Sequence, residues 1–340
     1  MKKIYEMGKI IGLGNALIDL LVMLDDDNLL SHMGLCKGAM QLISATKFQE
    51  LNKIITSKEV YMSTGGSAAN TIQALASLNT PVGFIGKIGE DEYGRFFAKS
   101  FKAKNIDCHL ICDKEQASGV ATTFISKDSE RTFGTYLGAA ADLIDSEIFG
   151  EVLSEYDYLY VEGYLVQNHE LILRAMKLSK ELGLKICIDL ASYNIISGDL
   201  SFFKRLIKDY VDIVFANEDE AYAFTGTEDP VEALNLISET CEIAIVKVGS
   251  KGSYVKDKKS AHHIKTFQDD CVIDTTGAGD YYAAGFLYGH TKGFDIETCG
   301  NIGALLSGHI IQVVGANLSE SRWDTVKLNL MNIVPNNETF

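Results

Sequence analysis

The stretch Val272-Ile273-Asp274-Thr275-Thr276-Gly277-Ala278-Gly279-Asp280 begins apolar, ends in a glycine-rich turn, and is followed at once by a helical run over 281–287. Its small residues, 277–279, leave backbone N–H groups uncovered at the N-terminus of that helix. Such a turn can hold a phosphate through free N–H donors and the helix dipole. The stretch therefore predicts an anion site, with Asp280 beside it in the first helical turn.

Asp280 has a simpler interpretation as an ordinary helix N-cap, and a bare Gly-x-Gly-Asp would favour that alternative. Two threonines and a second aspartate precede it here. The Thr276 hydroxyl can donate to a phosphate, and Asp274 can bind a cation. The heptapeptide as a whole favours a phosphate site in which the carboxylate takes part in the chemistry.

Outward from this stretch, short apolar runs alternate with amphipathic ones, with no repeat of solenoid period. The runs typical of strands are 10–13, 82–85, 158–161, 186–188, 213–215 and 243–248. The helical patterns are 68–78, 92–103, 170–182, 218–225 and 231–240. This alternation predicts an α/β fold: a doubly wound, mainly parallel sheet with helices on both faces.

Two segments, 20–43 and 106–136, break the alternation with strand-like patterns that lack a helical period. We expect them to form a small β-strand lid on a single domain spanning 1–340, because an active site needs a cover that excludes water. A pair of ordinary surface hairpins is the alternative.

Composition narrows the choice of partners. The net charge of −15 and the pI of about 4.9 argue against a nucleic-acid or anionic-membrane surface. The seven cysteines are odd in number and form no Cys-x-x-Cys pair, which is typical of free thiols in a reducing cytoplasm. We therefore expect small-molecule ligands.

The motif at 274–280 resembles the signature of the ribokinase-like (pfkB) family of sugar and nucleoside kinases. The resemblance implies that the amides of Gly277, Ala278 and Gly279 form an anion hole for the transferred phosphoryl group, and that Asp280 accepts the proton of the substrate hydroxyl. Phosphoryl transfer needs such positioning and charge neutralisation more than covalent help. Walker A and protein-kinase motifs do not occur in the sequence.

A second motif, Gly65-Gly66-Ser67-Ala68-Ala69-Asn70, opens the predicted helix 68–78. Taken alone it is a capped helix after a turn. Together with 274–280 it resembles the family's Gly-Gly motif, which implies that Gly65, Gly66, Ser67 and Asn70 lie in the acceptor pocket and at the lid hinge. The stretch 83–94 resembles a further family motif near the same pocket.

At the first strand, the segment 14–19 places Asn15 and Asp19 in an apolar run, where polar side chains are costly unless they are paired. The segment resembles the Gly-Asn-x-x-x-Asp of adenosine kinases. The resemblance implies that Asp19 holds the ribose 2′- and 3′-hydroxyls, helped by Asn70 and the Gly66 backbone, with Asn15 near the base or ribose. Asp19 alone would indicate a sugar as substrate, whereas the presence of Asn15 favours a nucleoside.

Further on, Glu130-Arg131-Thr132 precedes Tyr136-Leu137-Gly138-Ala139. The family resemblance implies that Arg131 stabilises charge near the phosphates and that Tyr136 and Leu137 flank the base. A solvated arginine in a hairpin is the alternative for Arg131.

Three more sets of residues resemble nucleotide and metal sites of the family. Asn217 and Glu220 match its Asn-x-x-Glu motif, which implies Mg²⁺ held through waters; an acidic first turn favoured by the helix dipole is the alternative. Lys247, Gly249 and Gly252 match a strand and turn that lie against ATP, and Thr276 faces its phosphates. A monovalent cation, K⁺, is expected behind the anion hole, with the ligands Asp274 and Thr276 and the carbonyls of Ile310, Val313 and Gly315.

The first hypothesis is therefore an ATP- and Mg²⁺-dependent kinase that phosphorylates the 5′-hydroxyl of adenosine, as a monomer or homodimer. The second is a sugar kinase of the same family, acting on ribose, fructose or 2-keto-3-deoxygluconate. An NAD-dependent oxidoreductase is disfavoured, because Gly12-Leu13-Gly14 lacks the third glycine of the dinucleotide motif, position 17 being Leu. A non-catalytic nucleoside-binding protein is disfavoured by Asp280.

Overall fold

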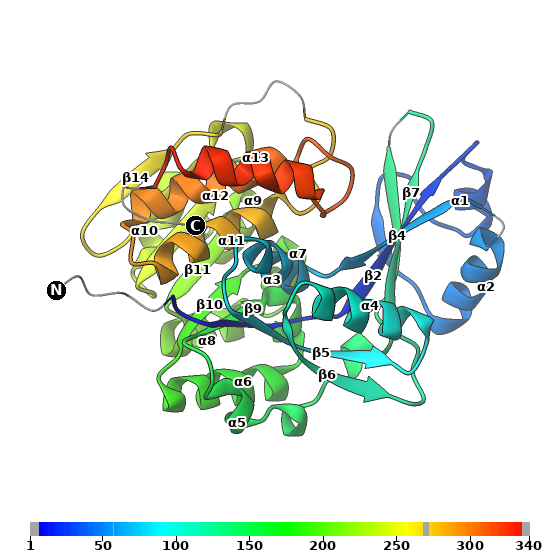
Figure 1. Cartoon of the computed structure of the whole chain (residues 1–340), viewed down its shortest axis with the longest axis horizontal. Coiled ribbons are helices and arrows are strands. Elements are labelled where there is room, and N and C mark those ends of the chain that lie inside the picture. Colours follow the sequence, from blue (N-terminus) through cyan, green and yellow to red (C-terminus); the bar gives the residue numbers. More distant parts are fainter. Residues whose placement is uncertain (1–6, 57, 129, 268–271, 335–340) are drawn as a thin grey trace.

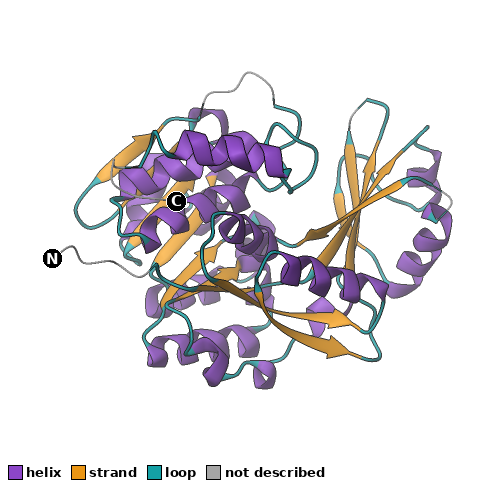
Figure 2. Cartoon of the chain, viewed as in Figure 1, coloured by secondary structure: helices purple, strands orange, loops and turns teal. Residues whose placement is uncertain are grey.

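A computed structural model of the chain describes residues 7–56, 58–128, 130–267 and 272–334. Its main element is a nine-stranded sheet (Figures 1 and 2). In spatial order the strands are β14 (Ala261–Ile264), β13 (Ser253–Lys256), β12 (Ile243–Lys247), β11 (Ile213–Asn217), β10 (Lys185–Asp189), β9 (Tyr158–Glu162), β1 (Ile10–Leu13), β5 (Val82–Gly89) and β6 (Asp107–Asp113). The pairs from β12 to β6 are parallel, and β13 and β14 are antiparallel additions at one edge.

Helices cover both faces of this sheet. One face packs against α3 (Ser67–Ser77), α4 (Glu92–Ala103), α11 (Ala278–Thr291), α12 (Ile296–Ile310) and α13 (Glu320–Leu330). The other packs against α5 (Gly150–Leu153), α6 (His169–Leu182), α7 (Tyr193–Gly198), α8 (Leu200–Tyr210), α9 (Glu218–Thr225) and α10 (Pro230–Ser238). In the described part of the chain, no helix has the length and apolarity needed to cross a membrane.

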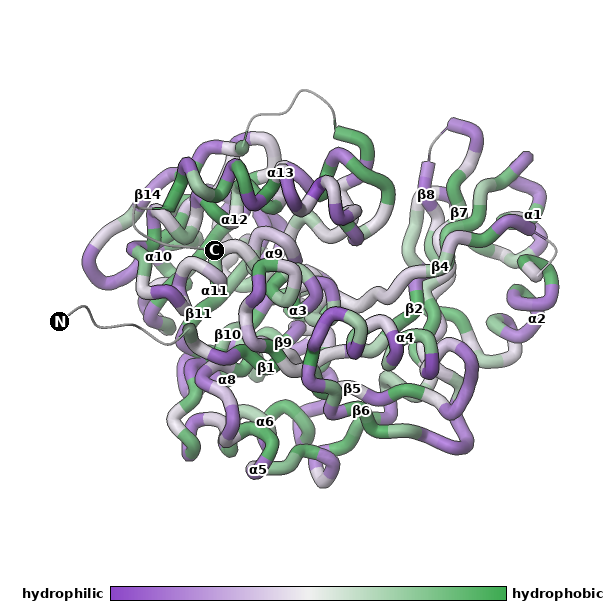
Figure 3. Tube along the Cα trace, viewed as in Figure 1, coloured by the Kyte–Doolittle hydropathy of each residue, from purple (hydrophilic) through white to green (hydrophobic). Residues whose placement is uncertain are grey.

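Side chains that alternate along each central strand enter two separate cores. Phe215 and Ile245 join the core beneath α11, whereas Val214 and Val246 join the core beneath α8. Both faces are therefore buried, which explains the continuous apolar runs of the sequence. Hydrophobic residues are coloured green along the trace in Figure 3. The prediction of a doubly wound α/β fold is confirmed.

A second, five-stranded sheet stands beside the first (Figure 1). Its strands, in spatial order, are β3 (Met40–Leu42), β8 (Arg131–Tyr136), β7 (Gly119–Ile125), β2 (Leu17–Met23) and β4 (Val60–Gly65). Two helices, α1 (Asn28–His32) and α2 (Ala45–Ile55), lie on the side of this sheet that points away from the large one. Strand residues of alternating position, such as Leu20 and Val22, share a core with Phe48 of α2.

The strands of this small sheet differ from those predicted from segments 20–43 and 106–136. Strand β6 lies in the second segment but pairs with β5 of the large sheet from Asp107 to Asp113. It is an edge strand in which no residue is fully buried, so it lacks the continuous buried run of the central strands. Conversely, β4 lies outside both segments, and α1, too short to show a helical period, lies within the first.

Candidate active site

Polar side chains end four neighbouring strands of the large sheet. Strands β9, β10, β11 and β12 finish at Glu162, Asp189, Asn217 and Lys247. These strands are parallel, so their carboxyl ends meet at one edge, where open α/β sheets bind ligands. Two cavities lie at this edge, of about 330 and 590 Å³.

The smaller cavity brings together segments that are far apart in the sequence. Asp19 enters it from β2, Ser67 and Asn70 from α3, and Asp280 from α11. Gly66, Thr276 and Gly279 also line it, as do Asp189, Asn217, Glu220 and Lys247 from the sheet edge. Predicted acceptor, phosphate and metal residues therefore share one cavity.

Asp280 is held by the helix that faces it. Its carboxylate accepts from Ser67 Oγ at 2.7 Å and from Asn70 Nδ2 at 2.9 Å. Loss of hydration raises its pKa to about 6, while these two hydrogen bonds work to lower it. Asp280 is therefore mainly a carboxylate at neutral pH, and its two protein donors fix its direction.

The turn before Asp280 has the backbone that its glycine requires. Gly277 is the N-cap of α11 with φ of 77°, a left-handed conformation that other residues adopt at a cost. The N–H of Ala278 donates to the Thr275 carbonyl at 3.1 Å. Of the three predicted anion-hole amides, those of Gly277 and Gly279 donate to no acceptor within the described residues.

Asp19 faces the same cavity. No donor among the described residues hydrogen-bonds its carboxylate, which lies so close to Gly65 that a β-carbon there would overlap it. Loss of hydration, and then the charge of Asp280, raise the pKa of Asp19 to about 7. A half-buried carboxylate without donors is a site for ligand hydroxyls.

Asn15 lies apart from this cavity. It is buried, and both its backbone N–H and its side-chain amide donate to Glu162. The other carboxylate oxygen of Glu162 accepts from Ala68 N at 3.0 Å, in the first turn of α3. Asn15 therefore ties the first strand to α3 through Glu162, instead of lining the cavity as the sequence predicts.

Tyr136 and Leu137 are also absent from the described lining of both cavities. The Tyr136 ring stacks on Phe48 of α2 at 4.9 Å between centroids, on the helix-covered face of the small sheet. Alternation along β8 places Phe133 and Thr135 on the opposite face, which is the face of Asp19.

Arg131 reaches from β8 to the turn before α11. Its guanidinium lies 2.6 Å from Asp274 Oδ2 and donates to Thr276 Oγ at 3.2 Å. Asp274 also accepts from Thr276 N, Thr276 Oγ and Gly315 N. Burial works to raise the pKa of Asp274, but these hydrogen bonds and Arg131 outweigh it and lower the pKa.

The premise of the predicted cation site is therefore corrected: Asp274 is not an unpaired carboxylate. The Ile310 carbonyl accepts from Val313 N at 3.2 Å, so it too has a protein partner. In the structure, Arg131 contacts the same Asp274 and Thr276 oxygens that the sequence assigns to a monovalent cation, together with the carbonyls of Ile310, Val313 and Gly315.

Asn217 and Glu220 form a capping box at the start of α9, each side chain bonding the other's backbone N–H. Loss of hydration, and then Asp189, raise the pKa of Glu220 to about 7. A buried carboxylate beside a second one, both facing a cavity, fits a divalent cation. Because the box already occupies Glu220, a Mg²⁺ held through waters fits better than direct coordination.

The larger cavity adjoins the smaller one and is more apolar. Phe267, Ala304 and Ile311 form part of its wall. Gly249 and Gly252, with φ of 54° and 95°, lie in a turn that also lines it. A β-carbon on Gly252 would overlap the Ile264 carbonyl, so only glycine fits there. Its size and its apolar wall suit the base of a nucleotide whose phosphates point toward Gly279.

Residues 29–323 match the pfkB family of carbohydrate kinases. The chain belongs to this family. Among solved structures, an adenosine kinase from Sinorhizobium meliloti is 31% identical with a TM-score of 0.84, covering 95% of this chain and 100% of that one. A probable sugar kinase from Rhizobium etli CFN 42 is 29% identical with a TM-score of 0.86, over 96% and 99%.

Sequence relatives extend the likeness to sugar kinases. The 5-dehydro-2-deoxygluconokinase of Bacillus subtilis (strain 168) is 29% identical over 260 residues, which cover 73% of this chain and 80% of the relative. As a pfkB-family kinase, the protein binds ATP and a small-molecule substrate.

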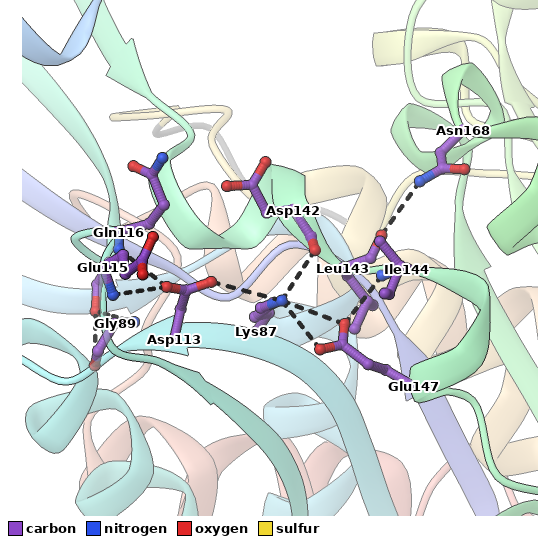
Figure 4. A network of polar contacts seen from close by, with 11 residues as sticks. Lys87, Gly89, Asp113, Glu115, Gln116, Asp142, Leu143, Ile144, Glu147 and Asn168 are labelled. Atoms are coloured by element: carbon purple, nitrogen blue, oxygen red, sulfur yellow. Dashed lines mark hydrogen bonds and ion pairs between the residues drawn. The ribbon is translucent and has the colours of Figure 1, made fainter.

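The pfkB-like stretch 83–94 braces the two sheets and lies outside the described cavity linings. Lys87 of β5 donates to the Asp142 carbonyl and to Glu147, each at 3.0 Å, and lies 3.5 Å from Asp113 (Figure 4). These contacts clamp β5 and β6 to the short 3₁₀ helices η1 (Gly138–Asp142) and η2 (Asp145–Glu147). Asp91 caps α4 and bonds Ser118 at the start of β7.

Two acidic residues at the candidate site were not predicted from the sequence, and neither were Tyr164 and Ala191, which also line the smaller cavity. Asp189 lines the smaller cavity and pairs with Lys247, and Glu162 links Asn15 to α3. Both are acidic residues that end an otherwise apolar strand. That position, at the carboxyl edge of a predicted parallel sheet, was the available signal.

Replacing Glu162 by Gln should lower the free energy of unfolding by about 1–3 kcal/mol, because an amide N–H₂ would face a backbone or side-chain donor and leave it without an acceptor. Denaturant titration measures the change. Glu151→Gln, on an exposed helical turn, is the matched control and should change little. Equal stability of the two variants would contradict the role given to Glu162.

Proposed function

We propose that the protein transfers the γ-phosphoryl group of ATP to the 5′-hydroxyl of adenosine, giving AMP and ADP. The observation that carries this proposal is that Asp19 and Asp280 line one cavity, Asp19 with no donor among the described residues and Asp280 held by Ser67 and Asn70. Asp19 accepts the ribose 2′- and 3′-hydroxyls, and Asp280 accepts the 5′-hydroxyl proton. Solved kinases that resemble this chain and are named adenosine kinases support the proposal.

The apolar face of the small sheet is an argument for a substrate that contains a nucleobase. Alternation from Asp19 along the paired strands puts Met23, Met40, Leu42 and Tyr61 on the side of the sheet opposite α1 and α2. All four are more than half exposed. Apolar side chains exposed on a ligand-facing surface are the partners of a flat aromatic base; a free sugar would need polar ones. We propose that this sheet is the lid.

The charge of the acceptor cavity also favours a neutral substrate. Its described lining carries the carboxylates of Asp19, Asp189, Glu220 and Asp280, and its one basic side chain is Lys247. A sugar acid would place its own carboxylate among these. Asn70 Oδ1 is buried and accepts no hydrogen bond within the described chain, so a further ligand hydroxyl would satisfy it.

The proposal gives the remaining residues the following roles. The free amides of Gly277 and Gly279, at the N-terminus of α11, receive the transferred phosphoryl group. Mg²⁺, held through waters by Asn217 and Glu220, neutralises phosphate oxygens when bound. The second candidate, a sugar kinase, is favoured by the sequence relatives named 5-dehydro-2-deoxygluconokinase.

Steady-state assays with ATP and Mg²⁺ against nucleosides and sugars test the proposal. We expect the highest kcat/KM for adenosine, and a loss of about 10- to 1000-fold with 2′,3′-dideoxyadenosine, because a hydrogen bond to a charged group contributes about 1.5–3 kcal/mol. Asp19→Asn should lose a similar factor on adenosine and discriminate the two nucleosides far less. A sugar or sugar acid with a higher kcat/KM than every nucleoside would overturn the acceptor assignment.

The acidic limb of the pH profile tests Asp280 as base. Its raised pKa, about 6, means that kcat/KM should fall as the pH drops through 6, since only the carboxylate accepts a proton. Asp19, with a pKa of about 7, contributes to the same limb. Asn70→Ala removes a donor that stabilises the Asp280 carboxylate, so its limb should move to higher pH.

The control for this shift is Asn235→Ala, whose side chain bonds Lys256 on the far side of the sheet. Its limb should coincide with that of the wild type. A limb in Asn70→Ala that stays in place, or moves to lower pH, would remove Asp280 from the role of base.

A further inference from the structure

The two cavities share three lining residues: Asn217, Lys247 and Gly279. A phosphoryl group that passes from a nucleotide in the larger cavity to an acceptor in the smaller one must pass this boundary. Lys247 is the basic side chain there; no other Lys or Arg lines either cavity within the described residues. Its position coincides with the path of the transferred charge.

Lys247 is directed to this boundary by a carboxylate of the neighbouring strand. It ends β12, and its Nζ donates to Asp189 Oδ2 at 2.8 Å, while the Ala191 N–H donates to the other Asp189 oxygen at 3.0 Å. The Lys247 side chain is 16% exposed. A β-carbon on Gly279 would lie 3.0 Å from Nζ, so the ammonium group sits against the backbone of the first turn of α11.

The charge state of Lys247 suits this position. Burial works to lower its pKa, but the charges of Asp189 and Glu220 and the hydrogen bond to Asp189 outweigh burial, so the pKa is raised. The ammonium group therefore keeps its proton throughout the neutral range. Arg131, the expected source of positive charge, lines neither cavity and is held by Asp274.

We propose that Lys247 is a catalytic residue whose ammonium group binds the transferred phosphoryl group at the boundary of the two cavities. This inference rests on the proposed function only in that the protein is a kinase; it is independent of which acceptor is used. As the bond from γ-phosphorus to the bridging oxygen of ADP breaks and the bond to the acceptor oxygen forms, the acceptor proton goes to Asp280. Lys247 exchanges Asp189 for a phosphoryl oxygen and keeps its own proton.

The test measures kcat and KM for ATP and for the best acceptor of the wild type. Lys247→Met should lower kcat by about 100- to 1000-fold, as does loss of a group that stabilises transition-state charge, with smaller changes in either KM. Lys247→Arg keeps the charge and should recover part of the loss. Lys185→Met is the matched control, because Lys185 pairs with Glu242 at the opposite edge of the same sheet and should leave kcat unchanged.

Two further variants keep the test decisive. Lys247→Met combined with Asp189→Asn does not leave Asp189 as a buried carboxylate without its partner, so it should fold and still lack turnover; wild-type turnover in the double variant overturns the proposal. Arg131→Met tests the alternative that Arg131, and not Lys247, binds the transferred phosphoryl group. A larger fall in kcat for Arg131→Met than for Lys247→Met, or a change in Lys247→Met confined to the KM for ATP, also overturns it. Failure of adenosine as acceptor is detected separately, in the wild-type substrate panel.

Discussion

The carboxylate of Asp280 accepts from Ser67 and Asn70, and this contact joins the N-termini of the two helices on which the site is built. Helix α3 follows strand β4 of the small sheet directly, through Gly65 and Gly66, whereas α11 follows the glycine-rich turn that begins at Asp274. Gly66 has φ of 102° and approaches the Asn15 carbonyl so closely that a β-carbon would overlap it. The hydrogen bonds from Ser67 and Asn70 to Asp280 therefore fix the end of β4, and with it Asp19, relative to the loop that would hold the phosphate.

A high density of negative charge is the cost of this arrangement. Burial raises the pKa of Asp19, Glu162, Glu220 and Asp280, which lie within or beside one cavity. Uncompensated carboxylates there would be strongly unfavourable. Backbone and side-chain donors offset the cost at Glu162 and Asp280, and Lys247 offsets it at Asp189. Asp19 has no donor within the part of the chain that the structure describes, and ligand hydroxyls would donate to it.

The sequence was sufficient for the parts that depend on local chemistry. Continuous apolar strands predicted the parallel sheet, and the glycines and acid of 274–280 predicted a helix N-terminus with Asp280 in its first turn. The sequence was insufficient where it had to predict the direction in which a side chain points. Asn15 turned to Glu162 and Tyr136 to Phe48, because partners distant in sequence, invisible to a local pattern, were available there. Edge strand β6 was assigned to the wrong sheet for a similar reason: its half-exposed residues lack the buried run that marks the central strands of the large sheet.

The proposed phosphoryl transfer depends most on Asp280, as the group that would accept the hydroxyl proton. Turnover and adenosine binding of Asp280→Asn, measured side by side with the wild type, test it most directly. We expect kcat to fall by about 10²- to 10⁴-fold, the usual contribution of a general base, while the dissociation constant for adenosine stays within a few-fold, because the amide keeps the shape and an acceptor oxygen. Near-normal turnover of this variant would contradict the account.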